Sequence, residues 1–262
     1  MKIPFTKETE LCRAFLDSVP DTWTAYPETG GFDILMVRKA DGFQVGIEAK
    51  LRLNAKVISQ AAEDTSEWRV ARENPDCRAV LIPEGVSLDL APVCNLIGLT
   101  IIRIRHGDQA RHYSSKFYPE LPDLSQQYWD NRGWYERCPT KRISLPDWIP
   151  DVPAGDSAPV ALTNWKVGAI KLVITLEKRG FLTRGDFSHF KISMSRWSQE
   201  HWLVKDGQGG WIAGPYLPDF RQQHPVNFEQ IAADFEKWKS PESAVQRGLF
   251  SSVGDRDGEA AA

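Results

Sequence analysis

The chain has 262 residues, of which 42% are hydrophobic and 26% charged, and its formal net charge is −3. This composition is typical of a globular protein and excludes collagen-like, wholly disordered and disulfide-scaffold classes. No apolar run approaches the roughly 20 residues that a membrane-spanning helix needs, so we expect no membrane partner. The first residues lack the apolar core of a secretory signal and the four cysteines form no CxxC pair, which favours a cytoplasmic protein without disulfides or a zinc site.

Residues 1–118 predict a mixed α/β layer, because segments with helical periodicity alternate with short apolar runs. Pro20 ends the first helix, and Asp41-Gly42 is a hairpin turn signal between the first two strands. In chain order we expect a helix at 7–19, strands at 32–37 and 43–51, a helix at 55–73, a strand at 77–82, a helix at 88–97 and a strand at 99–104.

The predicted hairpin brings three ionisable side chains to one face. A two-residue turn places Asp33 opposite Lys50, and a rearranged turn places Asp33 opposite Glu48, but in both registers the three side chains share a face. Charges inside apolar strands are costly to bury unless they are paired or used. Two carboxylates suit Mg²⁺, with Mn²⁺ as an alternative, and a lysine can orient or deprotonate an attacking water. A salt bridge across the hairpin is the alternative explanation.

The segment Tyr26-Pro27-Glu28-Thr29-Gly30-Gly31-Phe32-Asp33, followed by Gly46-Ile47-Glu48-Ala49-Lys50, resembles the core motif of the PD-(D/E)XK nuclease superfamily, which includes restriction endonucleases and Holliday-junction resolvases. The resemblance covers residues 7–105 in outline, and Phe32 stands where many members have proline. It implies a restriction-endonuclease-like αβββαβ core with a mixed sheet. It also implies that Asp33 and Glu48 ligate the metal and that Lys50 is the catalytic lysine.

Two accessory positions follow from the same resemblance. Members often carry a glutamate on the first helix, and Glu8 shares the inward stripe of that helix whereas Glu10 does not. Many members also carry a glutamine on the helix after the lysine, and Gln60 stands ten residues beyond Lys50. An exposed first-turn acid and a solvated glutamine are the alternative readings. Glu28 is close enough to be another ligand, although a role in the turn is favoured.

The remainder of the chain predicts four further parts. Residues 119–160 contain seven prolines and are expected to form a connector, within which residues 151–157 are an exposed linker. A helical DNA-binding domain is expected over residues 161–225. A C-terminal helix over 226–250 and a disordered tail over 251–262 complete the chain.

The expected DNA-binding domain is the basic part of an acidic chain. Residues 161–205 have eight basic and three acidic side chains, a net charge of +5. Their order of helix, turn, helix, turn, helix and small hairpin resembles a winged helix-turn-helix, in which one helix enters the major groove. A packing or dimerisation module with solvated charges is the alternative. The residues that we expect to contact phosphates and base edges are Arg184, Lys191, Ser195, Arg196 and Gln199.

The sequence therefore predicts a two-domain, Mg²⁺-dependent DNA endonuclease. The five histidines lack metal-ligand spacing, and no nucleophile-elbow or phosphate-loop motif offers a competing centre. The rival reading is a non-catalytic DNA-binding or scaffold protein that retains the nuclease fold. A third reading makes the second domain a protein-interaction module and the substrate RNA or branched DNA. A homodimer stays open as an alternative to a monomer.

Overall fold

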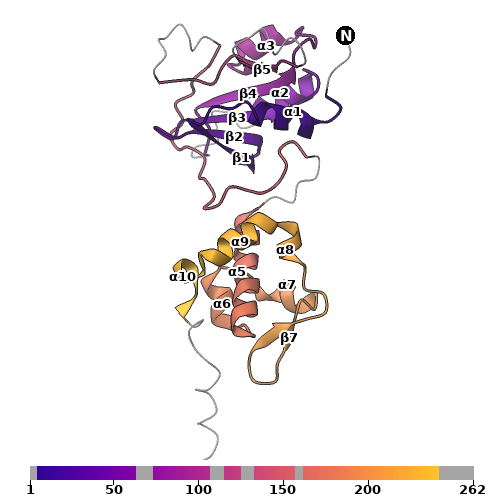
Figure 1. Cartoon of the computed structure of the whole chain (residues 1–262), viewed down its shortest axis with the longest axis vertical. Helices are drawn as coiled ribbons and strands as arrows, with labels where there is room; N and C mark the ends of the chain where they lie inside the picture. The colour runs from indigo at the N-terminus through magenta and orange to yellow at the C-terminus, as the bar shows by residue number, and fades with distance from the viewer. Residues whose placement is uncertain (1–4, 63–72, 107–114, 125–132, 157–161, 242–262) are drawn as a thin grey trace, which may run out of the picture. The chain divides into compact units, whose positions relative to one another are not determined.

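The computed structural model describes residues 5–62, 73–106, 115–124, 133–156 and 162–241. It divides the chain into two units, Met1–Ala161 and Leu162–Ala262, whose elements are drawn in Figure 1. The elements of the first unit are α1 (Glu8–Leu16), β1 (Trp23–Thr29), β2 (Phe32–Arg38), β3 (Gln44–Ala49), α2 (Ala55–Ala62), β4 (Cys77–Pro83), α3 (Ala91–Leu96), β5 (Thr100–Ile104) and β6 (Phe117–Tyr118).

A six-stranded mixed sheet forms the centre of the first unit, and the expected α/β class is confirmed. The strands lie in the order β1-β2-β3-β4-β5-β6, and Figure 1 shows the first five of them side by side. The β3–β4 and β4–β5 pairs are parallel, and the other pairs are antiparallel. The first six elements of the unit therefore follow the order α-β-β-β-α-β.

Apolar side chains cover both faces of this sheet. Helix α1 buries Leu11 and Phe15 against one face, in a cluster that includes Ile34 and Ile47 of the central strands. Helices α2 and α3 cover the other face, where Val57 packs with side chains of β4. Each fully buried side chain of this kind contributes about 1.5–3 kcal/mol. The two layers fix the ends of β2 and β3, where the candidate catalytic side chains lie.

Strand β1 is absent from the elements expected from the sequence. It is an edge strand that pairs only with β2, and most of its side chains are partly exposed. Its interior contains Pro27, which an edge strand tolerates but which weakens a strand pattern. The turn that joins it to β2 is Gly30-Gly31, and both glycines have positive φ.

Two further expectations for this unit are refined by the structure. The expected helix over 55–73 begins as predicted, and its described part ends at Ala62, since residues 63–72 lie outside the described ranges. The β2–β3 hairpin takes the rearranged register, with Ile34 opposite Ile47. Its loop is held by two hydrogen bonds between the Arg38 guanidinium and the Asp41 carboxylate, of 2.9 and 2.8 Å.

The proline-rich segment expected as a connector is part of the first unit. Its side chains Leu121, Ile143 and Ala154 are buried in the clusters of that unit. The Gln44 side chain donates to the carbonyl of Ile143 and accepts from its N–H, at 2.8 and 2.9 Å. This proline-rich segment therefore lacks helical or strand periodicity, but several of its side chains are buried.

The second unit contains a bundle of helices and a small hairpin. Helix α5 (Asn164–Arg179) has Thr163 as N-cap and Gly180, at φ +85°, as C-cap. Its elements are α5 (Asn164–Arg179), α6 (Arg184–His189), α7 (Met194–Gln199), β7 (Leu203–Lys205), β8 (Trp211–Ala213), α8 (Phe220–Gln223), α9 (Pro225–Ala233) and α10 (Phe235–Trp238). Leu182 forms an isolated bridge to Trp211, which adds a third short segment to the β7–β8 hairpin.

Of the C-terminal helix expected over residues 226–250, the described part forms two helices, α9 and α10, within the second unit, and residues 242–250 lie outside the described ranges. Helix α9 contacts α5, and its Phe228 and Ile231 side chains are fully buried. The expected tail over 251–262 lies outside the described residues. In the part of the chain that the structure describes, no helix has the length and apolar character needed to cross a membrane.

Candidate active site

Four candidate residues meet where β2 begins and β3 ends. Asp33 is the second residue of β2, Glu48 is near the end of β3, and Lys50 follows that strand directly. The β2–β3 register pairs Ile34 with Ile47, and its continuation by one position places Asp33 opposite Glu48. Glu8 is the first residue of α1.

Lys50 connects the acids of this site. Its Nζ lies 2.7 Å from Oε2 of Glu8 and 4.0 Å from Oδ2 of Asp33. The same oxygen of Asp33 accepts a hydrogen bond of 2.7 Å from the N–H of Ala49. Glu10 points elsewhere, since its carboxylate accepts hydrogen bonds from the N–H groups of Thr6 and Lys7 at the start of the helix. The acid on the first helix that contacts Lys50 is therefore Glu8.

The site combines partial burial with an excess of negative charge. Glu48 is buried, and the side chains of Asp33 and Lys50 are only 15% and 22% exposed. Burial opposes the charge on Lys50, but the hydrogen bond that Lys50 donates to Glu8 and the charges of Asp33, Glu8 and Glu48 outweigh burial and raise the pKa of Lys50. Burial raises the pKa of Asp33, against the hydrogen bond from Ala49 and the charge of Lys50. Lys50 is thus held in its ammonium form among carboxylates.

Glu28 is a member of this cluster that the sequence favours as a turn residue. It precedes the end of β1, and the β1–β2 register of Pro27 with Ile34 and Thr29 with Phe32 places it opposite Asp33. Its carboxylate accepts a 2.8 Å hydrogen bond from the N–H of Gly155. Burial raises the pKa of Glu28 to about 7, with a further contribution from Asp33, against the N–H groups of Gly155 and Asp156. The Gly-Gly turn after β1 is the sequence signal that could have revealed this pairing.

Gln60 lies on α2, the helix that follows Lys50. Its side chain is partly buried, and its Oε1 atom is buried without a hydrogen-bond partner among the described residues. No hydrogen bond within the described ranges joins it to Asp33, Glu48 or Lys50. The structure therefore places Gln60 on the expected helix but does not bring it into the contacts of the site.

The carboxylates at this end of the sheet supply oxygen donors, the type of ligand that Mg²⁺ prefers. Within the described ranges, no group of three or more His, Cys, Asp or Glu side chains is arranged to hold a metal ion. Mg²⁺ needs fewer protein ligands than such a group supplies, because it is usually bound by one or two carboxylates, waters and substrate phosphates. Asp33 and Glu48, opposite each other on adjacent strands, fit that requirement.

The five residues expected to contact DNA are all exposed in the second unit. Arg184 begins α6, Lys191 lies between α6 and α7, and the other three are on α7. The guanidinium of Arg196 lies over two indole rings, 5.5 Å from the centroid of Trp165 and 5.2 Å from that of Trp202. Such contacts hold an arginine head in place while leaving its N–H donors accessible at the edge.

Some cations of the second unit form ion pairs with acids. Arg179 pairs with Asp186, Arg221 with Glu177 and Glu229, Lys237 with Asp234, and Lys239 with Glu236. Arg184, Lys191, Arg196 and Lys205 have no ion pair within the described part of the chain. Lys166 and Lys178 of α5 likewise have no ion pair within the described residues, so positive charge without an acidic partner lies on α5 as well as on α6, α7 and β7.

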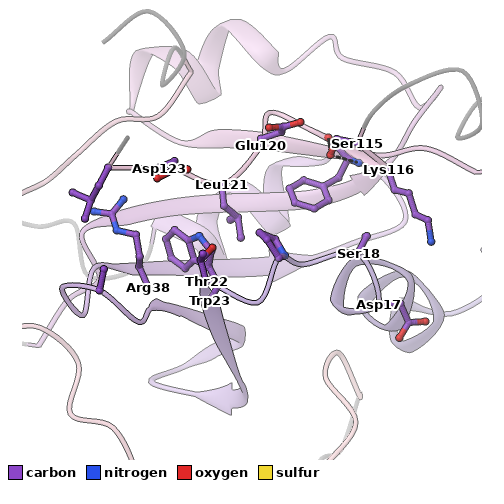
Figure 2. A pocket seen from close by; sticks show the side chains of 14 residues that line it. Asp17, Ser18, Thr22, Trp23, Arg38, Ser115, Lys116, Glu120, Leu121 and Asp123 are labelled. Carbon is purple, nitrogen blue, oxygen red and sulfur yellow. Dashed lines mark hydrogen bonds between the residues drawn. The ribbon is translucent and has the colours of Figure 1, made fainter. Parts of the chain in front are cut away.

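A hollow of about 660 Å³ lies at the other end of β1 and β2 (Figure 2). Trp23, Arg38 and Leu121 line it, together with acids such as Asp123. The Arg38 guanidinium is already engaged, by Asp41 and by the carbonyl of Pro122. This hollow contains none of the residues expected to act in catalysis.

Comparison with protein families, curated proteins and solved structures finds no match to the chain.

Proposed function

We propose that the chain is a Mg²⁺-dependent DNA endonuclease whose second unit binds the DNA. The observation that carries the proposal is the meeting of Asp33, Glu48 and Lys50 at one end of the sheet, with Lys50 bound to Glu8. The α-β-β-β-α-β order of the first six elements supports the resemblance to the PD-(D/E)XK nucleases. The reaction would be hydrolysis of phosphodiester bonds.

Each residue of the site has a distinct part in such a reaction. A Mg²⁺ ion held at the site would supply Lewis-acid chemistry to the phosphate and to the attacking water. Asp33 and Glu48 would hold the ion through their carboxylate oxygens. The ammonium group of Lys50 would orient the attacking water and stabilise charge that develops on the phosphate. Glu8 positions that ammonium group.

The second unit supplies the affinity for DNA in this proposal. The helices α6 and α7 and the β7–β8 hairpin have the order of a winged helix-turn-helix, with α7 as the helix for the major groove. Arg184, Lys191 and Arg196 would bind phosphates. Ser195 and Gln199 of α7 present side chains suited to base edges. The presence on these elements of cations without an ion pair among the described residues supports this role.

Metal dependence tests the nuclease proposal. Purified protein is incubated with supercoiled plasmid, linear duplex, single-stranded DNA, branched DNA and RNA, with Mg²⁺, Mn²⁺ or EDTA. We expect nicked or linear plasmid DNA with either metal and intact DNA in EDTA, measured by gel electrophoresis. Absence of metal-dependent cleavage of every substrate would contradict the proposal. The rival function is a DNA-binding scaffold, and the absence of a three-ligand metal group among the described residues favours it. Such a scaffold would bind DNA in the same preparation without cutting it.

Salt dependence tests the binding role of the second unit. Arg184→Ala and Lys191→Asn should each lower the slope of log affinity against log salt concentration by about 0.9, because each removes one phosphate contact. Asparagine is chosen because Lys191 has φ +54°, a conformation that asparagine tolerates. Lys237→Ala is the matched control, since Lys237 is paired with Asp234. Fluorescence anisotropy measures the slopes, and equal slopes in all four proteins would refute the assignment.

A further inference from the structure

A short strap, residues 153–156, crosses the start of α1 in the first unit. Ala154 is buried in the main cluster of that unit. Gly155 has φ +72°, and a Cβ atom built on it would lie 2.9 Å from Sγ of Cys12 and 3.3 Å from the carbonyl carbon of Glu8. The backbone of the strap therefore lies directly against the first turn of the helix, at a distance that only glycine allows.

Glu28 anchors the strap. Its carboxylate accepts a 2.8 Å hydrogen bond from the N–H of Gly155, and the N–H of Asp156 also holds it. Glu28 itself has φ +48°, a left-handed conformation that is uncommon for residues other than glycine. Such a conformation persists where surrounding contacts determine it. Two successive backbone donors on one carboxylate supply such contacts.

The contacts continue from the strap to the candidate catalytic lysine. Gly155 packs on Glu8, and a Cβ atom built on it would lie 3.4 Å from Cβ of that residue. The Glu8 carboxylate in turn holds Nζ of Lys50 at 2.7 Å. Glu8 is the first residue of its helix, where helices fray most readily. A contact that holds the first turn also holds the partner of Lys50.

We infer that Glu28 is a positioning residue of the candidate active site and that it acts through the strap. Its carboxylate fixes Gly155, Gly155 fixes the first turn of α1, and Glu8 on that turn holds Lys50. The catalytic consequence rests on the proposed function. The strap lies outside the residues that resemble the nuclease superfamily, so that resemblance assigns it no role. The alternative is that the strap is packing alone, without effect on Lys50.

The test uses the full chain and compares variants at the two ends of the anchor. Glu28→Ala removes the acceptor, whereas Glu28→Gln keeps an acceptor oxygen and removes the charge. Gly155→Ala forces the strap away from Cys12 and provides a second route if Glu28→Ala does not fold. Gly133→Ala is the matched control, since Gly133 also has positive φ but a Cβ atom there would meet only Pro119 Cγ, at 4.0 Å.

Amide hydrogen exchange is the first readout, because it does not depend on activity. In Glu28→Ala and Gly155→Ala we expect exchange at Leu11, whose N–H bonds to the carbonyl of Lys7 in the first turn, to accelerate about tenfold. Exchange of the Gly155 amide should accelerate as well in Glu28→Ala. Glu28→Gln should retain most of the protection, and Gly133→Ala should retain all of it. Unchanged exchange at Leu11 when the strap is released would overturn the inference.

Cleavage kinetics are the second readout. We expect kcat to fall at least about tenfold in Glu28→Ala and Gly155→Ala, with KM unchanged, because a displaced lysine affects the transition state more than DNA binding. Rescue of kcat by Glu28→Gln distinguishes positioning from loss of fold, and unchanged kcat with a released strap would overturn the inference. If the wild-type protein cuts no DNA, the proposed function fails, while exchange at Leu11 still decides whether Glu28 holds the first turn.

Discussion

Lys50→Met is expected to lower the rate of DNA cleavage by about 10²- to 10³-fold and to leave the affinity for DNA unchanged. The ammonium group lies between two carboxylates and is partly buried, so its loss removes a charge that no neighbouring cation in the described contacts replaces. Methionine matches the length of the lysine side chain without its charge. Affinity is expected to persist because the proposal assigns it to the second unit. Single-turnover cleavage and anisotropy on the same preparation measure the two quantities.

Two further variants show whether the effect belongs to the site. Lys39→Ala removes an exposed lysine from the loop at the other end of the same hairpin and should cleave like the wild-type protein. Glu8→Gln keeps a hydrogen-bond acceptor for Lys50 and should lose only about tenfold, since it repositions the lysine without removing it. Cleavage by Lys50→Met at the wild-type rate would exclude a catalytic lysine at this position.

Asp186→Ala is expected to lower the free energy of unfolding of the second unit by about 3–5 kcal/mol, because it removes the carboxylate that neutralises the charge of a buried arginine. Asp186 is fully buried and pairs with Arg179, whose side chain is 8% exposed. Its carboxylate also accepts hydrogen bonds from the N–H and hydroxyl of Thr183 and from the hydroxyl of Ser240. Urea unfolding followed by hydrogen exchange in each unit measures the loss.

The same network sets an expected pH dependence. Burial disfavours the charged form of Asp186, but the hydrogen bonds from Ser240, Thr183 and Arg179 outweigh burial and lower the pKa of this carboxyl. Its contribution to stability is therefore present above the pKa of an unfolded aspartate, about 4, and is lost as the pH falls through the folded value. Asp186→Asn should reduce this loss of unfolding free energy at acidic pH.

An exposed aspartate of the same unit provides the control. Asp219→Ala removes an exposed N-cap, which accepts a hydrogen bond from the N–H of Gln222, and should cost only about 1 kcal/mol. Equal losses in Asp186→Ala and Asp219→Ala would show that the buried network contributes no more than a surface cap.

The parts of the fold that the sequence predicts are those whose signals are local. The stripe of Leu11 and Phe15 defines α1, and the alternation around Ile34 and Ile47 defines the hairpin faces. These periods follow from the geometry of one element, so that they predict the shared face of Asp33 and Glu48 without knowledge of the rest of the chain. The choice between two hairpin registers needed the structure, since it depends on how the Arg38–Asp41 loop closes.

The parts that the sequence does not predict depend on distant contacts. Glu28 and Gly155 are 127 positions apart, and no local pattern joins them. The hydrogen bonds between the Gln44 side chain and the backbone of Ile143 likewise span 99 positions. Proline-rich residues 119–156 have no period by which burial could be recognised, so their contribution to the first unit becomes visible only in three dimensions.

The two edges of the six-stranded sheet bear on how copies of the chain could associate. An exposed, regular edge strand is a template for pairing with another chain. One edge here is β1, whose Pro27 lacks the N–H donor that such pairing needs, and the other is β6, which is only two residues long. Both edges disfavour a sheet that continues from one copy into the next. A homodimer of this protein would therefore form through side-chain surfaces, without strand pairing between the sheets of the two copies.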